Sequence, residues 1–157
     1  FSANVKTRRA YQDLFRKRLI EKSYEAIAPP LLMLALPHVH SSQLRAGEPF
    51  FRMREADGVP NSHTSIDVIE RGVNAWRYAL QPVTGRKHQL RVHMAALGAP
   101  IVNESLYPTL QEQLPGDFSR PLQLLAKALR FVDPIDGRQR TFESRRSLQE
   151  MEKMGSE

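Results

Sequence analysis

The sequence predicts an α+β protein built on a mainly antiparallel β-sheet with flanking helices. Between residues 31 and 83, segments rich in apolar and β-branched residues are separated by Gly, Asp and Asn, which is typical of strands joined by tight turns. Segments near the N-terminus and after residue 83 carry apolar residues at three- and four-residue spacing, which predicts helices. A closing hairpin is predicted after residue 121, turned at Asp136 and Gly137.

The composition limits the classes of function. The chain has 157 residues, 41% of them hydrophobic, which suits one domain with its own core. It has no cysteine, which excludes disulfides, thiolate metal sites and thiol redox chemistry, and is compatible with the cytoplasm. The longest apolar run, at residues 31–36, is too short to span a membrane, so we expect no membrane partner. A net charge of +6 favours polyanions such as nucleic acid as partners.

The first element is predicted to be a basic amphipathic helix. Ser2 or Asn4 can cap it, and it should run to about Leu19. The residues expected to face inward are Tyr11, Leu14, Phe15 and Leu19. Those expected to face outward are Lys6, Arg9 and Arg16. This outer face is the first basic surface of the chain.

Five strands are expected next, at residues 21–28, 31–36, 49–56, 63–70 and 74–83. The first ends at Pro29 and Pro30 and places Tyr24 and Ala26 on one side. A lone tyrosine in a strand is more often a packing residue than a catalytic one. The later strands alternate apolar and polar residues, as strands with one buried face require.

Residues 84–97 are predicted to form one helix, capped by Thr84 and ended by Gly98 and Pro100. Leu90, Met94 and Leu97 share its apolar face. The spacing places Arg86, Gln89 and His93 on one polar stripe, and His88 and Arg91 on another. By periodicity alone, a basic solvated surface helix and a functional helix remain equally open.

No metal site is predicted. His38 and His40 would share a strand face, but no third ligand stands at a recognisable spacing. His88 and His93 are five residues apart rather than four. We therefore interpret these histidines as surface residues.

The order of residues from Thr84 to Tyr107, beginning TGRKHQLRVHMAALGAPI, resembles the late motif of the RluA-type RNA pseudouridine synthases, TGRxHQ(I/L)RVH followed by Gly-x-Pro-Ile and an aromatic residue. The resemblance extends from about Phe1 to about Ser144 and implies the catalytic fold of that family. Lys22, Ser23 and Tyr24 match its K(S/T)Y pattern. One departure is Leu125, where the family usually has histidine.

The resemblance implies a mechanism without metal or cofactor. Uridine is flipped out of the RNA, an aspartate attacks it, and the base rejoins the ribose through carbon. Tyr24 is then the residue that contacts the base, and Arg91 is the partner of the aspartate. The expected RNA-binding residues are Arg9, Arg16, Arg86, Lys87, His88, Gln89 and His93. The expected apolar residues of the base pocket are Leu122 and Leu124.

The nucleophile is not in this chain. The family carries it in an R-L-D-x-x-(T/S)-(A/S)-G segment just before the position of Phe1, and no aspartate here has that context. We therefore expect a piece of a longer protein, inactive alone, whose residues 1–146 form the C-terminal part of the catalytic domain and whose residues 147–157 form a short charged helix or tail. The function expected of the parent is an RNA pseudouridine synthase acting on rRNA or tRNA as a monomer. A non-catalytic RNA-binding module of the same fold remains open, as does a basic scaffold protein.

Overall fold

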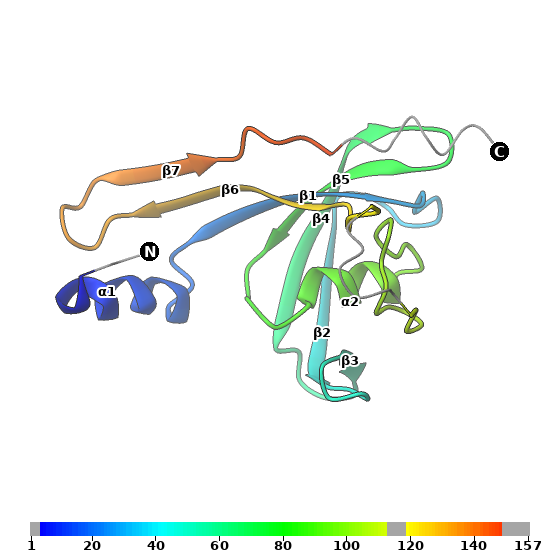
Figure 1. Ribbon diagram of the computed structural model, residues 1–157, viewed down its shortest axis with the longest axis horizontal. Coiled ribbons are helices and arrows are strands. Elements are labelled where there is room, and N and C mark those ends of the chain that lie inside the picture. Colours follow the sequence, from blue (N-terminus) through cyan, green and yellow to red (C-terminus); the bar gives the residue numbers. More distant parts are fainter. Residues whose placement is uncertain (1–3, 113–118, 149–157) are drawn as a thin grey trace.

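The computed structural model describes residues 4–112 and 119–148. Within these residues the chain forms two helices and a seven-stranded antiparallel sheet, with strand order β3-β2-β4-β5-β1-β6-β7 (Figure 1). The elements are α1 (Val5–Arg16), β1 (Glu21–Ala28), β2 (His38–Ala46), β3 (Met53–Ala56), β4 (Ser62–Arg71), β5 (Trp76–Pro82), α2 (Gln89–Ala96), β6 (Leu124–Val132) and β7 (Gln139–Glu143). The predicted α+β class with a mainly antiparallel sheet is confirmed.

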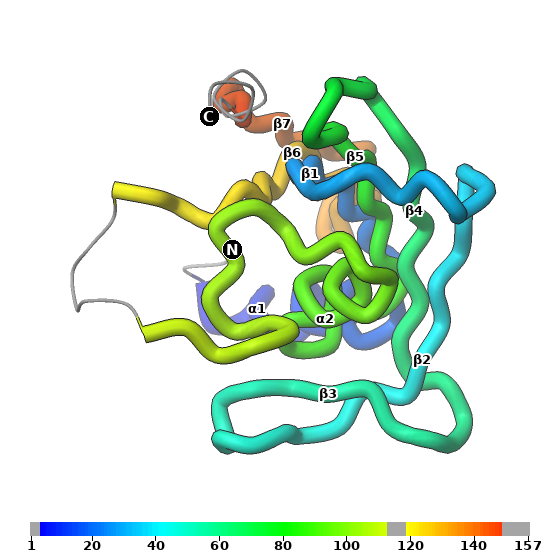
Figure 2. The backbone as a smooth tube through the Cα atoms, turned by 90° about the vertical axis from the view of Figure 1, so that its right-hand side faces the viewer, coloured from blue at the N-terminus to red at the C-terminus, as the bar shows by residue number. Residues whose placement is uncertain are grey.

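Both helices lie on the same side of the sheet, below it in Figure 1. The sheet curls, so that β2 and β3 pass around α2 and the helix is enclosed by strands above, beside and below it (Figure 2). Within the described part of the chain, no helix is long and apolar enough to cross a membrane.

The main core lies between the sheet and α2. It is built from inward-facing residues of β1, β4 and β5 together with Leu90 and Met94 of α2, as the apolar spacing of that helix predicted. Tyr24 and Ala26 both belong to this face, so the side predicted for them is confirmed. Tyr78 is fully buried, and its hydroxyl donates to the carbonyl of Pro29 at 2.8 Å.

The apolar run at residues 31–36 does not form the predicted strand. Leu31 is buried and its N–H donates to Tyr78 Oη at 2.9 Å, while Leu32 and Met33 are 77% and 99% exposed. Only some of the run therefore packs on the core, in a turn between β1 and β2. A continuous apolar run carries no period, so composition alone could not separate a strand from this turn.

The first helix is shorter and less buried than its pattern predicted. Asn4 caps it, accepting from the N–H of Lys6 at 2.9 Å, and it ends at Arg16. Leu14 is buried in a small second core. Phe15 and Leu19 were expected to face inward but are 45% and 58% exposed, because α1 meets the sheet along a narrow strip only.

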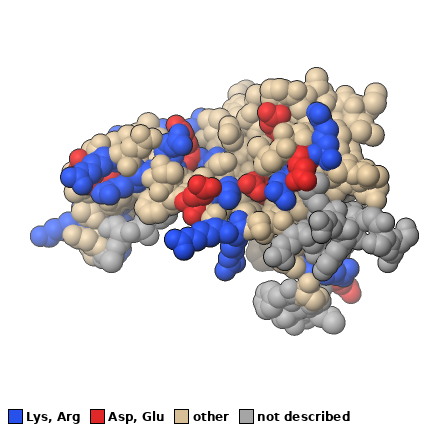
Figure 3. Space-filling view, turned by 90° about the horizontal axis from the view of Figure 1, so that it is seen from above, with Lys and Arg blue, Asp and Glu red and all other residues tan. Residues whose placement is uncertain are grey.

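Basic side chains gather over the end of the molecule that carries α1, β6 and β7, with acidic side chains between them (Figure 3). The closing hairpin predicted at Asp136 and Gly137 is confirmed as β6 and β7, and Gly137 adopts a φ of +70°, which glycine tolerates best. Arg9 and Arg16 are exposed on α1, as predicted. The short charged helix or tail expected at residues 147–157 lies largely outside the described residues.

Candidate active site

A cleft of about 350 Å³ lies between the two helices, with Tyr24 of β1 and Arg91 of α2 both in its wall. The other residues that line it are Phe15, Lys22, Pro82, Thr84, Gly85, Arg86, His88, Gln89, Leu90 and Leu124. The two residues to which the resemblance assigns catalytic roles, Tyr24 and Arg91, thus open into one cleft. Among the described residues that line the cleft there is no carboxylate.

The turn that precedes α2 replaces the first part of the predicted helix. The helix begins at Gln89 rather than at Thr84, because His88 has a left-handed φ of 55°. Gln89 Oε1 accepts from Thr84 Oγ1 at 2.7 Å and from the N–H of Arg86 at 3.1 Å. These bonds close a compact loop and take the place of the helix cap that Thr84 was expected to supply. The loop points Arg86 and Lys87 into solvent.

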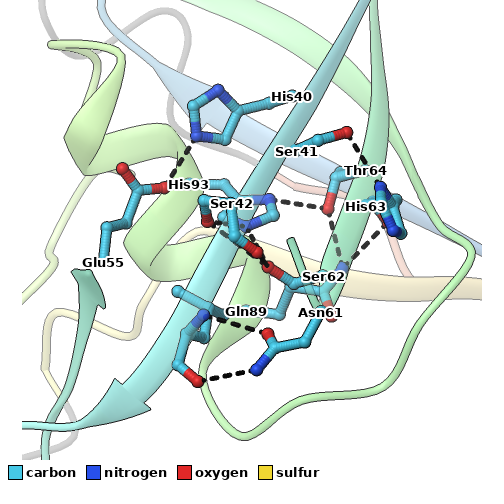
Figure 4. A network of polar contacts seen from close by, with 11 residues as sticks. His40, Ser41, Ser42, Glu55, Asn61, Ser62, His63, Thr64, Gln89 and His93 are labelled. Atoms are coloured by element: carbon cyan, nitrogen blue, oxygen red, sulfur yellow. Dashed lines mark hydrogen bonds and ion pairs between the residues drawn. The ribbon is translucent and has the colours of Figure 1, made fainter. Parts of the chain in front are cut away.

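Two of the three residues of the predicted polar stripe, Gln89 and His93, are buried rather than exposed, and only Arg86 faces solvent. Gln89 is 4% exposed and His93 is fully buried. Both side chains point into a hydrogen-bonded network that joins α2 to β2 and β4 (Figure 4). The amide of Gln89 and both ring nitrogens of His93 already have hydrogen-bond partners within the chain.

The network determines which nitrogen of His93 carries the proton. Ser62 Oγ donates its proton to the carbonyl of Ser42 at 2.7 Å, so it can only accept from His93 Nε2, 3.0 Å away. Ser42 Oγ also lies 3.1 Å from Nε2, and the contact with Ser62 favours the tautomer that is protonated on Nε2. On the other side Thr64 Oγ1 accepts from Gln89 Nε2 at 2.9 Å and donates to His93 Nδ1, also at 2.9 Å.

His93 is consequently a neutral ring with both nitrogens used. Its burial, and next to that the nearby His40, lower its pKa from 6.5 to about 4. Potential ligand atoms of His40, Glu55 and His93 lie within 4.8 Å of one another, a grouping that could hold a metal ion. A metal would need a lone pair that His93 already commits to Thr64, so the hydrogen bonds favour a structural role.

The sequence led us to interpret the histidines as surface residues, and the structure corrects this interpretation. His40 lies half-buried, and its Nε2 is 2.7 Å from Glu55 Oε1. His88 is half-buried in the cleft wall, with Nδ1 2.8 Å from Tyr107 Oη. Burial, and then the charges of Arg91 and Lys87, lower the pKa of His88, so this ring is neutral near pH 7.

Arg91 is paired within the chain. Its Nε donates to Glu104 Oε2 at 2.7 Å, and its Nη2 donates to Glu104 Oε1. The guanidinium also lies over the ring of Tyr107, with 5.6 Å from its carbon to the ring centroid. Sequence reasoning assigned no role to Glu104, because a glutamate in a crossing segment carries no signal of its own.

Lys22 is a second residue that the sequence reasoning missed. Its Nζ donates to the carbonyl of Thr84 at 3.0 Å, which ties the start of β1 to the turn before α2. Burial, and then the charge of Arg18, lower the pKa of Lys22. Its place two residues before Tyr24 in the K(S/T)Y pattern was the available signal.

Of the two apolar residues expected in the base pocket, one lines the cleft and the other does not. Leu124, at the start of β6, lines the cleft beside Tyr24. Leu122 packs against the main core and is not among the cleft-lining residues. Leu125, which stands where the family usually has histidine, pairs with Glu25 in the sheet.

Comparisons with known proteins agree with this fold. A family model described as RNA pseudouridylate synthase matches residues 1–96. The dual-specificity RNA pseudouridine synthase RluA of Vibrio vulnificus is 35% identical over 147 residues, which is 85% of this chain and 55% of that protein. Its counterpart in Escherichia coli K12 is 37% identical over 84 residues, 53% of this chain and 37% of that protein.

Solved structures give the same result. Human RNA pseudouridylate synthase domain containing 1 superposes with a TM-score of 0.69 and 26% identity, covering 90% of this chain and 61% of that one. Human RNA pseudouridylate synthase domain containing 4, at 23% identity and a TM-score of 0.64 over 94% of this chain and 65% of that one, shows the shared fold alone.

The chain therefore belongs to the RNA pseudouridylate synthase family. Within that family it is of the RluA type, as the resemblance predicted. It spans about a third to about half of the length of the curated relatives it matches.

Proposed function

We propose that the full-length protein is an RNA pseudouridine synthase that isomerises uridine to pseudouridine in rRNA or tRNA, and that this chain supplies the base-contacting and arginine side of its active site. The observation that carries the proposal is the meeting of Tyr24 and Arg91 in one cleft of a chain of this family. The relatives named above are themselves described as RNA pseudouridine synthases.

The chemistry needs a base held outside the RNA stack, and the cleft offers the means. A flipped uridine would lie against the ring of Tyr24, since stacking on an aromatic residue offsets part of the cost of unstacking the base. Leu124 beside Tyr24 gives the base an apolar neighbour. The cleft volume of about 350 Å³ suits one nucleotide rather than a duplex.

The nucleophile has to come from outside the described residues. Arg91 would receive the carboxylate of an upstream aspartate, keep it ionised and aim it at the nucleoside. We propose that the full-length protein carries this aspartate in an R-L-D motif. No metal or organic cofactor is needed, because bond breaking and rejoining both occur within one nucleotide.

The proposal is tested with full-length protein and RNA whose uridines are tritiated at C5. Forming the new bond at C5 releases the tritium to water, so we expect release by the wild-type protein and none after replacement of the R-L-D aspartate by asparagine. RNA binding without release by the wild type would instead support a non-catalytic RNA-binding module. This chain alone should bind RNA and release no tritium.

RNA binding should depend on the exposed basic residues before α2. Replacing both Arg86 and Lys87 by glutamine should weaken binding by this chain and flatten the slope of log affinity against log salt by about 1.4, since each contact to a single-stranded phosphate contributes about 0.7. The measurement is a filter-binding series across salt concentrations.

The matched control replaces Arg45 and Arg54 by glutamine. These two exposed arginines face each other as register partners in the β2–β3 ribbon, at the opposite edge of the sheet from β6 and β7. This double variant should keep the wild-type slope. Equal slopes for both double variants would remove Arg86 and Lys87 from the RNA-binding surface.

Two further parts of the proposal concern the oligomeric state of the protein and its location in the cell. We propose that the protein works as a monomer, because one cleft supplies both Tyr24 and Arg91. We also propose the cytoplasm as its location, in keeping with the absence of cysteine in this chain.

A further inference from the structure

Glu104 is a buried carboxylate that the chemistry described so far does not use. It lies in the segment that follows α2, where its N–H donates to the carbonyl of Ile101 at 2.9 Å. Its side chain is 1% exposed. Burying an ionised carboxylate is costly unless it is paired and hydrogen-bonded, so its partners define what the residue does.

The partners of Glu104 hold the Arg91 guanidinium in one orientation. The carboxylate receives Nε and Nη2 of Arg91, which is the side edge of the guanidinium plane. The N–H of Leu106 also donates to Oε1 at 2.7 Å, which prevents the carboxylate from rotating. A guanidinium has five N–H groups, so this pairing leaves the end edge, formed by Nη1 and the outer proton of Nη2, for a second acceptor.

The face of the guanidinium is constrained as well as its edge. Tyr107 lies beneath Arg91, and its hydroxyl is itself held by the N–H of Met53 at 2.7 Å and by His88 Nδ1 at 2.8 Å. A cation over a fixed ring loses rotational freedom as well as gaining attraction. The end edge of Arg91 therefore has a fixed direction in the wall of the cleft.

We propose that Glu104 is the positioning residue of this active site: it occupies the side edge of Arg91 so that the end edge receives the nucleophilic carboxylate in a single geometry. This inference rests on the proposed function. Glu104 touches neither substrate nor nucleophile and acts only through Arg91. The Glu104–Arg91 pair carries no net charge, so hydrogen bonds from the end edge of Arg91 would keep the nucleophile ionised as well as aim it.

The test is Glu104→Gln in the full-length protein. Glutamine keeps the shape and one oxygen but presents an N–H₂ group where Arg91 needs an acceptor, so the guanidinium loosens. We expect kcat for tritium release to fall about 10²-fold, the size of loss that misplacement by about 1 Å can cause, with KM for RNA unchanged. A residue that only supported the fold would change Tm without separating kcat from KM.

The matched control is Asp133→Asn. Asp133 also has a mostly buried carboxylate that accepts from an arginine, Arg140 Nε at 3.2 Å, and from a backbone N–H, that of Ile135 at 2.9 Å. It lies at the end of β6 and does not line the cleft. This variant should lower Tm and leave kcat unchanged.

A second readout uses this chain without any RNA. In the wild type the Arg91 Nε–H should give a sharp ¹⁵N-correlated signal in slow exchange with water, and in Glu104→Gln that signal should broaden or exchange rapidly. If Glu104→Gln fails to fold, Glu104→Asp serves instead, since its shorter carboxylate keeps the charge but reaches one nitrogen, and kcat should fall by less.

The outcomes separate this inference from the proposed function. Wild-type kcat in a folded Glu104→Gln protein would overturn the positioning role while leaving pseudouridine synthesis intact. An unchanged Nε–H signal in that variant would overturn the pairing on which the role depends. Absence of tritium release by the wild-type protein would overturn the proposed function, and the role of Glu104 with it.

Discussion

Arg91→Lys in the full-length protein is expected to abolish most pseudouridine formation while leaving the fold and much of the RNA affinity in place. Lysine keeps the positive charge, so long-range attraction for RNA is retained. It lacks the planar fork that binds Glu104 on one edge and an incoming carboxylate on another. A misaimed nucleophile loses about 10²-fold in rate or more, and we expect a loss of at least that size in tritium release.

The control for this change is Arg140→Lys. Arg140 also makes side-edge hydrogen bonds to carboxylates, with Asp133 and Asp136, but it lies on β7 away from the cleft. Its lysine variant should turn over RNA at the wild-type rate. If Arg91→Lys did the same, Arg91 would serve only as the structural partner of Glu104, and the role assigned to it by family resemblance would be lost.

The strands were predictable where one face is buried and the other is not. In β5, Trp76, Tyr78 and Leu80 are buried while the residues between them are less so, and this period of two is visible in the sequence. The run at residues 31–36 has no such period, because the turn it forms buries Leu31 and exposes Leu32 and Met33. Its location could be predicted from the sequence, but its conformation depends on contacts with distant residues such as Tyr78.

The positions of Tyr24 and Arg91 were predictable because each stands in a motif. The burial of Gln89 and His93 was not, because a helical wheel assumes one buried face. The sheet curls around α2 and contacts more than one side of it, so two polar residues are also enclosed (Figure 2). The sequence of β4 did indicate such a polar contact. Ser62 and Thr64 lie on the same inward face of the strand as Ile66, so their buried hydroxyls required polar partners.

Glu104 was not predictable by the same reasoning, because its importance depends on the segment after α2 folding back beside the helix. Nothing in the spacing of Arg91 and Glu104, thirteen residues apart, indicates a contact. Helical spacing rules reach only three or four residues, and the segment that carries Glu104 has no period of its own. Buried ion pairs between different elements of this kind become visible only in the fold.

His93 should make the stability of this chain depend on pH between about 6.5 and 4. The folded ring is neutral with a pKa lowered to about 4, whereas in the unfolded chain it titrates near 6.5. Its contribution is therefore present in full above pH 6.5 and is lost as the pH falls toward 4, since only the unfolded chain takes up the proton in that window. Because of this residue alone, the free energy of unfolding should fall by about 3 kcal/mol between pH 6.5 and pH 4.

Urea denaturation of this chain at pH 7.5 and pH 4 measures that fall. Carboxylates also contribute to acid destabilisation, so the informative quantity is the difference between the wild type and His93→Gln. The variant should be less stable at pH 7.5, because Ser62 and Thr64 lose a partner, yet its stability should fall by about 3 kcal/mol less on acidification. His38→Gln, which removes a histidine outside the network, should keep the wild-type fall. An equally steep fall in His93→Gln would mean that the fold does not hold the buried ring in its neutral form.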